Sequence, residues 1–238
     1  MHLLVSFSRR GSLKKLQICG NYGSLFLELN YANEPYNLIF LVKGKPLKPQ
    51  ISIAVEEDRS SAISTILLGF SSDPFVRWLC PHGPTYLKFY AAFNAFGGGA
   101  IDSGSAFIAE GNRGAALWLP PTIEPDSETF IGEVEKFVVK ERQELLFRIL
   151  EAFEEYHPDE SCWYLPLIAV DPAHQGSGIG SELMKAAMSR IDEDGLPSYL
   201  ESSNPRNISL YERYGYEVMG QIKIGDAPTI HPMYRPAR

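Results

Sequence analysis

Residues 163–194 contain three segments in succession: the apolar segment WYLPLIAV, the glycine-rich turn DPAHQGSGIG and a long amphipathic segment. An unbroken apolar run of this length is typical of a strand buried inside a sheet. The segment after the turn has apolar side chains at helical spacing on one side, namely Leu183, Met184, Ala187 and Ile191. Backbone N–H groups of a glycine-rich turn, joined to the positive end of a helix dipole, favour a bound anion. This region therefore predicts a strand–loop–helix unit with an anion site.

The rest of the C-terminal part alternates strand-like and helix-like patterns. Short apolar runs at ISIAV, SAFIAE, GAALWLPP, SYLES and YEVMGQIKI predict strands, and SAFIAE with GAALWLPP predicts a hairpin. Helical spacing predicts helices after the caps Asp58 and Asp73, over 84–96, over 130–156 and within NPRNISLYERYG. This order of elements predicts the α/β fold class.

The first part of the chain differs in character. Residues 1–49 mix short β-like runs, SLFLELNY and YNLIFLV, with glycine, asparagine and proline, and end in the linker-like KGKPLKPQ. We interpret 1–49 as an extension of unknown role and 50–238 as the functional domain.

Composition narrows the partners and the compartment. The formal net charge of -7 argues against nucleic acid and anionic membranes, both of which favour a basic face. Three widely spaced cysteines, Cys19, Cys80 and Cys162, fit buried thiols in a reducing compartment better than a disulfide framework. No apolar run approaches the roughly 20 residues of a membrane helix. We expect a cytoplasmic protein with no membrane partner.

The details of the turn argue against two nucleotide-binding loops. An ATP-binding P-loop needs Gly-Lys-Ser/Thr, and the first lysine after the turn is Lys185, inside the helix pattern. The dinucleotide pattern G-x-G-x-x-G, counted from Gly176, reaches Ser181 at its third place, whereas Gly180 comes one residue too early. The anion is therefore expected to belong to another ligand.

The pattern that fits is V-x-P-x-x-Q-G-x-G-x-G, present as Val170, Pro172, Gln175, Gly176, Gly178 and Gly180. It resembles the acetyl-CoA-binding motif of the GNAT superfamily of N-acetyltransferases. The segment NPRNISLYERYGYEV, about thirty residues downstream, is similar to a second segment of that family. The resemblance covers about residues 50–235 and implies a mixed, strongly twisted sheet flanked by helices.

The resemblance also implies the ligand and its binding residues. Loop amides of this family wrap the CoA pyrophosphate, and the preceding strand parts from its neighbour to admit the pantetheine. Carried onto this chain, the acetyl-CoA-binding residues are Ile168, Ala169, Val170, Gln175, Gly176, Ser177, Gly178, Ile179, Gly180, Ser181, Asn204 and Tyr211. Ser181 could instead only cap the helix.

The resemblance implies a direct attack by an amine on the thioester, which requires an acid and a base. Tyr211 matches the family's tyrosine on the thiol side and is the candidate acid, although it could simply pack its helix on the sheet. The strand before the loop carries no carboxylate, so the base is Glu201, an upstream acid such as Asp159 or Glu160, or bulk water. A strand-end carboxylate such as Glu201 is about as often a cap or an ion-pair partner. Cys162 is expected to be a buried thiol, not a nucleophile.

These observations predict an N-acetyltransferase that moves an acetyl group from acetyl-CoA to a primary amine of a small molecule or peptide. The alternative is a non-catalytic acyl-CoA-binding sensor or partner module, suggested by the strand that lacks a carboxylate. No metal is signalled, because the five histidines form no ligand-spaced cluster. We expect no nucleic-acid partner and a monomer or homodimer. The acceptor amine is not specified by any motif.

Overall fold

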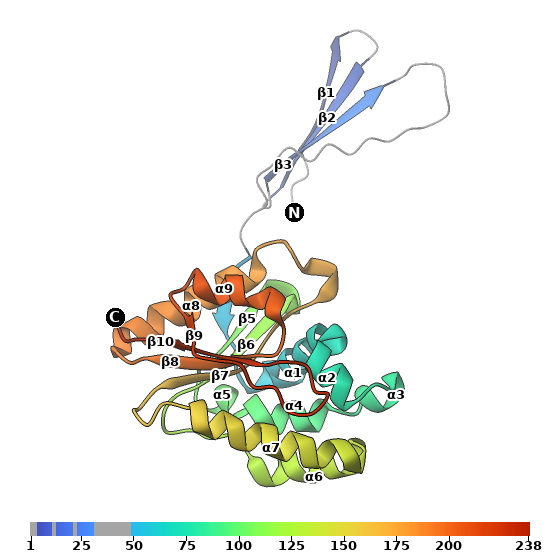
Figure 1. Ribbon diagram of the computed structural model, residues 1–238. Helices are drawn as coiled ribbons and strands as arrows, with labels where there is room; N and C mark the ends of the chain where they lie inside the picture. The colour runs from blue at the N-terminus through green and yellow to red at the C-terminus, as the bar shows by residue number, and fades with distance from the viewer. Residues whose placement is uncertain (1–3, 11–12, 21–22, 31–48) are drawn as a thin grey trace. The chain divides into compact units, whose positions relative to one another are not determined.

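The computed structural model describes the backbone of residues 4–10, 13–20, 23–30 and 49–238, with side chains from residue 49 onward (Figure 1). The chain divides into two compact units, Met1–Lys48 and Pro49–Arg238. The expected strand YNLIFLV and most of KGKPLKPQ lie outside the described residues.

The first unit contains an antiparallel sheet of three strands in the order β1–β2–β3. These strands are β1 (Leu4–Arg10), β2 (Leu13–Gly20) and β3 (Gly23–Asn30). The predicted strand in SLFLELNY is confirmed by β3. Gly20 of β2 pairs directly with Gly23 of β3.

The second unit is built on a seven-stranded sheet in the order β4–β5–β6–β7–β8–β10–β9. Its strands are β4 (Ile51–Ile53), β5 (Ala106–Ala109), β6 (Gly114–Leu119), β7 (Trp163–Val170), β8 (Ser198–Ser202), β9 (Glu217–Val218) and β10 (His231–Arg235). All neighbours are antiparallel except β7 and β8, which are parallel. The predicted α/β class with a mixed sheet flanked by helices is confirmed, and β5–β6 is the predicted hairpin.

Helices cover both faces of this sheet (Figure 1). On one side lie α8 (Ile179–Asp194) and α9 (Ile208–Glu212). The other elements are α1 (Arg59–Gly69), α2 (Pro74–Leu79), α3 (Gly83–Tyr86), α4 (Tyr90–Gly97), α5 (Gly99–Asp102), α6 (Ser127–Phe137) and α7 (Lys140–Tyr156). Alternate residues of each strand serve the two cores, since Ala116 and Trp118 pack with α8 whereas Ala115 and Leu117 pack with α1 and α4.

A β-bulge in β7 reverses this alternation. Leu117 pairs with Leu167 and Leu119 pairs with Tyr164, so two residues of β7, one of them Pro166, lie opposite one of β6. As a result Trp163 and Leu165 pack on the α8 side, whereas Leu167 packs on the α1 side. The strand was predicted to be buried on both faces, and the structure corrects this: its residues are buried and half-buried in turn.

Three predicted helices differ in the structure. The 84–96 helix is split into α3 and α4. Between them the N–H groups of Lys88 and Phe89 donate to the carbonyl groups three residues earlier, those of Thr85 and Tyr86, which is the tighter 3-10 pattern. The 130–156 helix is split into α6 and α7 by two extended residues, of which Val138 enters the core. The helix in NPRNISLYERYG shortens to α9, preceded by a 3-10 turn over Pro205–Asn207.

The predicted caps and the last strands also need comment. Asp73 caps α2 as predicted and accepts from the N–H groups of Phe75 and Val76, both at 3.0 Å. Asp58 does not cap α1 through its side chain, which instead accepts from the N–H of Val55 at 3.1 Å. The predicted strand YEVMGQIKI contributes only β9, while β10, which sequence patterns missed, contains Pro232.

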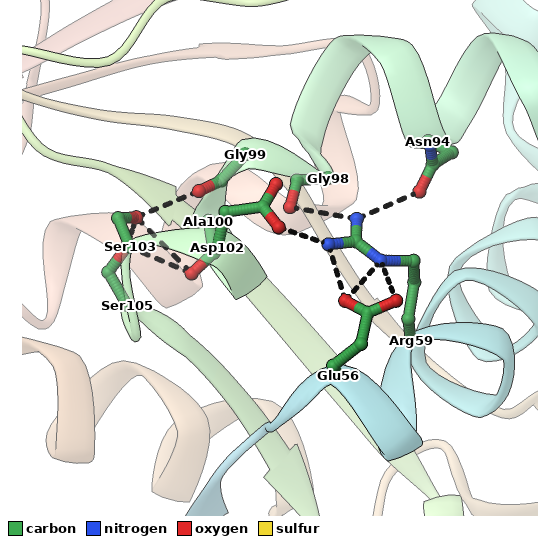
Figure 2. A network of polar contacts seen from close by, with 9 residues as sticks. All are labelled: Glu56, Arg59, Asn94, Gly98, Gly99, Ala100, Asp102, Ser103 and Ser105. Atoms are coloured by element: carbon green, nitrogen blue, oxygen red, sulfur yellow. Dashed lines mark hydrogen bonds and ion pairs between the residues drawn. The ribbon is translucent and has the colours of Figure 1, made fainter.

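A polar network joins the start of α1 to the junction of α4 and α5 (Figure 2). The Arg59 guanidinium contacts the carboxylates of Glu56 at 2.7 Å and Asp102 at 2.5 Å. It also donates to the Asn94 side chain at 3.2 Å and to the Gly98 carbonyl at 3.3 Å. The four acceptors belong to the 3-10 turn before α1, to α4 and its C-terminal end, and to α5. Their contacts with one guanidinium hold α1 against α4.

Gly69, the last residue of α1, allows that helix to approach β7. A Cβ built there would lie 2.5 Å from the Ala169 Cβ and 3.1 Å from the Val170 carbonyl oxygen. We expect Gly69→Ala to lower the free energy of unfolding by ~1–3 kcal/mol, because neither the Ala169 side chain nor the Val170 backbone can move aside easily. Gly132→Ala is the matched control, because Gly132 lies in α6 with open space around it. It should be neutral or stabilising by up to ~1 kcal/mol. Urea denaturation measures both, and equal effects would contradict the close approach.

Candidate functional site

The parallel strands β7 and β8 are paired only at their beginnings. Trp163 pairs with Ser198 and Tyr164 with Tyr199, and no further pairs follow between these two strands. Beyond that point Leu167 pairs with β6, whereas Leu200 pairs with β10. The two strands therefore part toward their carboxyl ends and leave an opening in the middle of the sheet.

Three cavities that share lining residues lie at this opening. The "loop cleft", about 610 Å³, lies along the glycine-rich turn and the end of β7. The "inner chamber", about 120 Å³, lies between the parted strands, and the "outer cleft", about 720 Å³, lies beside α6 and α7. Tyr211 lines both the loop cleft and the inner chamber, while Glu201 lines both the inner chamber and the outer cleft.

The glycine-rich turn depends on two glycines with left-handed backbone conformations. Gly176 and Gly178 adopt φ of 74° and 88°, a left-handed conformation that favours glycine. Gly178 is also the residue immediately before α8, so the turn ends at the positive pole of a sixteen-residue helix. Asp171 stabilises the start of the turn by accepting from the N–H of Ala173 at 2.8 Å. The arrangement suits an anion, as the sequence predicts.

Most of the residues predicted to bind acetyl-CoA line the loop cleft: Ile168, Ala169, Val170, Gln175, Gly176, Gly178, Ile179, Gly180, Ser181, Asn204 and Tyr211. Ser177 is not among the lining residues, and its hydroxyl donates to the His174 carbonyl at 2.5 Å. Three polar side chains of the set have internal partners. Gln175 donates to the Val170 carbonyl, Asn204 accepts from the N–H of Arg206, and Ser181 shares a hydrogen bond with Tyr214.

The candidate acid, Tyr211, is buried at the end of α9 where the loop cleft meets the inner chamber. Burial raises the pKa of its hydroxyl, and the nearby Asp73 carboxylate raises this pKa further. Tyr211 therefore stays protonated at neutral pH and is a hydrogen-bond donor. Its ring also packs against that of Tyr216, with centroids 6.2 Å apart, which agrees with the packing interpretation.

The candidate base, Glu201, lies near the end of β8 on the opposite side of the inner chamber. Its carboxylate accepts from the Tyr164 hydroxyl at 2.8 Å. Burial raises the pKa of Glu201 to about 7, although hydrogen bonding from Tyr164 and Tyr199 opposes the shift. A carboxyl group with a pKa near 7 exchanges protons readily at neutral pH, which is what a general base requires.

The raised pKa of Glu201 makes a prediction about stability. Between its ordinary value of 4.5 and about 7 the folded protein holds a proton that the unfolded chain has lost, so stability falls as pH rises through this range. We expect wild type to lose ~3 kcal/mol relative to Glu201→Gln between pH 4.5 and pH 8. Denaturant unfolding of both proteins across this range measures the difference. A difference that does not change with pH would contradict a buried, ionising Glu201.

Cys162 lines the outer cleft as a buried thiol. Burial raises the pKa of Cys162 to about 11, and the carboxylates of Glu160 and Glu201 contribute to this shift. Its sulfur lies 3.9 Å from Nε2 of His157. A thiol that keeps its proton is a poor nucleophile, which agrees with the expectation that Cys162 is not catalytic.

Sequence reasoning missed several residues of the site. Asp73 was predicted only as a cap, yet its buried carboxylate also accepts from the Ser203 hydroxyl at 2.8 Å and lines the loop cleft near Tyr211. Asn207 lines both the loop cleft and the inner chamber, and Tyr164 binds Glu201. None of these has a local sequence signal, because each depends on segments far apart in the chain. Asp159 and Glu160, the other acids considered for the base, do not line the three cavities.

Residues 49–238, together with the described strands of the first unit, include no group of three or more His, Cys, Asp or Glu side chains placed to hold a metal ion. Within the same residues, none of the helices combines the length and the apolar character needed to cross a membrane.

Comparison with known proteins agrees with this geometry. Residues 115–216, which run from β6 to the end of the α9 region, match the model of the Acetyltransferase (GNAT) family. This stretch of the chain is therefore similar to a GNAT acetyltransferase domain. The predicted resemblance is thereby confirmed.

Individual relatives are similar over shorter stretches or only in fold. An uncharacterized N-acetyltransferase of Schizosaccharomyces pombe is 38% identical over 58 residues, which is 24% of this chain and 24% of that protein. The match thus spans about a quarter of that relative. The structure of a Corynebacterium glutamicum histone acetyltransferase HPA2 and related acetyltransferase superposes with a TM-score of 0.58 and 23% identity, over 81% of this chain and 98% of that one. A polyamine N-acetyltransferase of Drosophila melanogaster that forms N-acetylagmatine gives 0.55 and 14%, over 78% and 98%.

Proposed function

We propose that this protein is an N-acetyltransferase that transfers the acetyl group of acetyl-CoA to a primary amine. The observation that carries the proposal is a row of three cavities, in which the donor Tyr211 lines the first two and the carboxyl group of Glu201, with a pKa of about 7, lines the last two. The match of residues 115–216 to the GNAT family model and the similarity to an N-acetyltransferase over 58 residues support the same reaction.

The residues of the path suit the parts of acetyl-CoA. The open glycine turn and the start of α8 offer backbone N–H groups to the pyrophosphate, and Arg206 and Arg213 add positive charge along the loop cleft. The apolar walls of the inner chamber, among them Leu167, Ile168 and Leu200, suit the pantetheine and the acetyl group. Acetyl-CoA, once bound, supplies the activated acetyl thioester.

The chain's own groups then have separate tasks. Glu201, in its ionised form, accepts a proton from the ammonium of the acceptor in the outer cleft and leaves a neutral amine as the nucleophile. Tyr211 donates a hydrogen bond toward the sulfur and transfers its proton as the C–S bond breaks and negative charge develops there. The nitrogen loses its second proton to solvent as the amide forms, and Tyr211 regains a proton from solvent. Tyr164 holds the Glu201 carboxylate in place.

The binding half of the proposal is tested by Gly178→Ala. Space around Gly178 is open, so an added methyl group would occupy the room that a pyrophosphate needs. We expect acetyl-CoA to bind the wild type and to bind this variant at least about tenfold more weakly, which is ~1.4 kcal/mol. Isothermal titration calorimetry measures both affinities.

The control is Gly195→Ala, which has a similar left-handed conformation, φ 64°, at the far end of α8. Both variants should lose about 1–2 kcal/mol of stability through backbone strain. Only Gly178→Ala should lose affinity. Wild-type protein that does not bind acetyl-CoA would overturn the proposed function. Binding without thiol release from any amine would instead favour the alternative, an acyl-CoA sensor.

Tyr211→Phe tests the chemical half. Among the described residues the Tyr211 hydroxyl has no hydrogen-bond partner, and the ring that packs against Tyr216 is kept, so the variant should fold normally. We expect kcat to fall by about 10²-fold, the range for loss of one acid–base group. The affinity for acetyl-CoA should stay within about twofold, because the ring is retained. Unchanged turnover would remove Tyr211 from the role of acid.

A further inference from the structure

The outer cleft is the part of the path whose ligand no motif identifies. It is the largest of the three cavities and has one end at Glu201. The remainder lies between the segment Pro120–Pro125, α6 and α7. Its position beyond Glu201, on the side away from the glycine turn, makes it the entrance for the acceptor.

The charged groups of the outer cleft all have the same sign. Glu124, Glu151, Glu154 and Glu201 line it, and among the described lining residues there is no lysine or arginine. Glu201 is half-buried where the outer cleft meets the inner chamber, whereas the other three are exposed. Exposed carboxylates attract cations weakly through solvent, and one that is partly shielded from solvent attracts them more strongly. The cleft therefore favours a cation whose charge comes to lie at its inner end.

The walls between the rim and Glu201 are aromatic and apolar. The Phe96 ring packs against Phe130 with centroids 5.2 Å apart and meets the edge of Tyr164 at 6.4 Å. His157 continues this row beyond Tyr164 at 5.9 Å. Phe147, Leu150 and Phe153 of α7 form the facing wall. Such walls bind a ring or another apolar body and leave a polar chain unsatisfied.

We infer that the acceptor is a small primary amine joined through a short linker to an aromatic or comparably bulky apolar body. The ammonium lies against Glu201 and Tyr164, and the apolar body lies along Phe96, Phe130 and Phe147. This inference rests on the proposed function and narrows its acceptor from amines in general to one chemical class.

The same walls disfavour the other classes of amine. A carboxylate next to the amine, as in a free amino acid, would meet Glu201 and lose its hydration without gaining a cationic partner. A peptide would bury backbone N–H and C=O groups against phenylalanine side chains. A linear diamine would place its methylene chain against the aromatic walls. Its second ammonium would reach only the exposed carboxylates at the rim, whose attraction is weakened by solvent.

A panel of matched amines tests the inference with the full-length protein and acetyl-CoA. Its members are 2-phenylethylamine, phenylalanine, putrescine and trialanine, and free-thiol release gives kcat/KM for each. Phenylalanine differs from 2-phenylethylamine only by a carboxylate, so the pair isolates the charge. We expect 2-phenylethylamine to exceed each of the other three by at least about tenfold. Calorimetric titration of the same amines into the protein, both alone and with CoA added, gives affinities that do not depend on turnover.

Phe147→Ala tests the wall, because Phe147 lines the outer cleft and not the inner chamber. We expect this variant to raise KM for 2-phenylethylamine by about tenfold and to leave KM for ethylamine within about twofold. Phe137→Ala is the matched control, since Phe137 is also half-buried on the neighbouring helix but lines none of the three cavities. Phe147→Leu, which keeps apolar volume, should have an intermediate effect, and the melting temperature of each variant reports its folding.

Preference for 2-phenylethylamine in both turnover and binding, together with a selective effect at Phe147, would support the inference. Preference for putrescine, phenylalanine or trialanine would overturn it and leave the proposed function intact. Failure of acetyl-CoA to bind would overturn the proposed function, and the calorimetric ranking of the amines would still decide the nature of the outer cleft.

Discussion

The parting of β7 from β8 is the feature on which the rest of the site depends. Two residue pairs, at Trp163 and Tyr164, join the halves of the sheet. Beyond them β7 is hydrogen-bonded only to β6, and β8 only to β10. The bulge at Leu165–Pro166 lies where the separation begins, and proline lacks the N–H that would continue a ladder. The opening is thus set by the local chemistry of one strand and is not a loose region of the sheet.

Around this opening the protein accepts unfavourable burial of polar groups. Burial raises the pKa of both Glu201 and Asp73, so each carboxylate is less stable there than in water. Asp73 is partly compensated by the N–H groups of α2 and by Ser203, which also tie α2 to the end of β8. Polar groups held at such a cost are expected where a site needs them and not where only packing is required.

The sequence predicts the local parts of this site well and the tertiary parts poorly. The glycine turn, α8 and the cap at Asp73 follow from neighbouring residues, so their patterns could be interpreted directly. The Tyr164–Glu201 hydrogen bond joins residues 37 positions apart, and no local pattern predicts it. The break at Val138 and the strand containing Pro232 were missed for the same reason, because core packing and pairing with β8 decide them.

Charge is also sorted along the path, although the chain as a whole is acidic. Arginines 206 and 213 lie along the loop cleft beside the start of α8, whereas the carboxylates of the outer cleft lie beyond Glu201. An anionic ligand and a cationic one would therefore be drawn to opposite ends of the opening, and each would be repelled from the other's end. Net charge cannot reveal this arrangement, since it sums groups that the fold separates. The parted strands thus both form the cavity and keep its two charged ends apart, which a transfer between an anionic donor and a cationic acceptor requires.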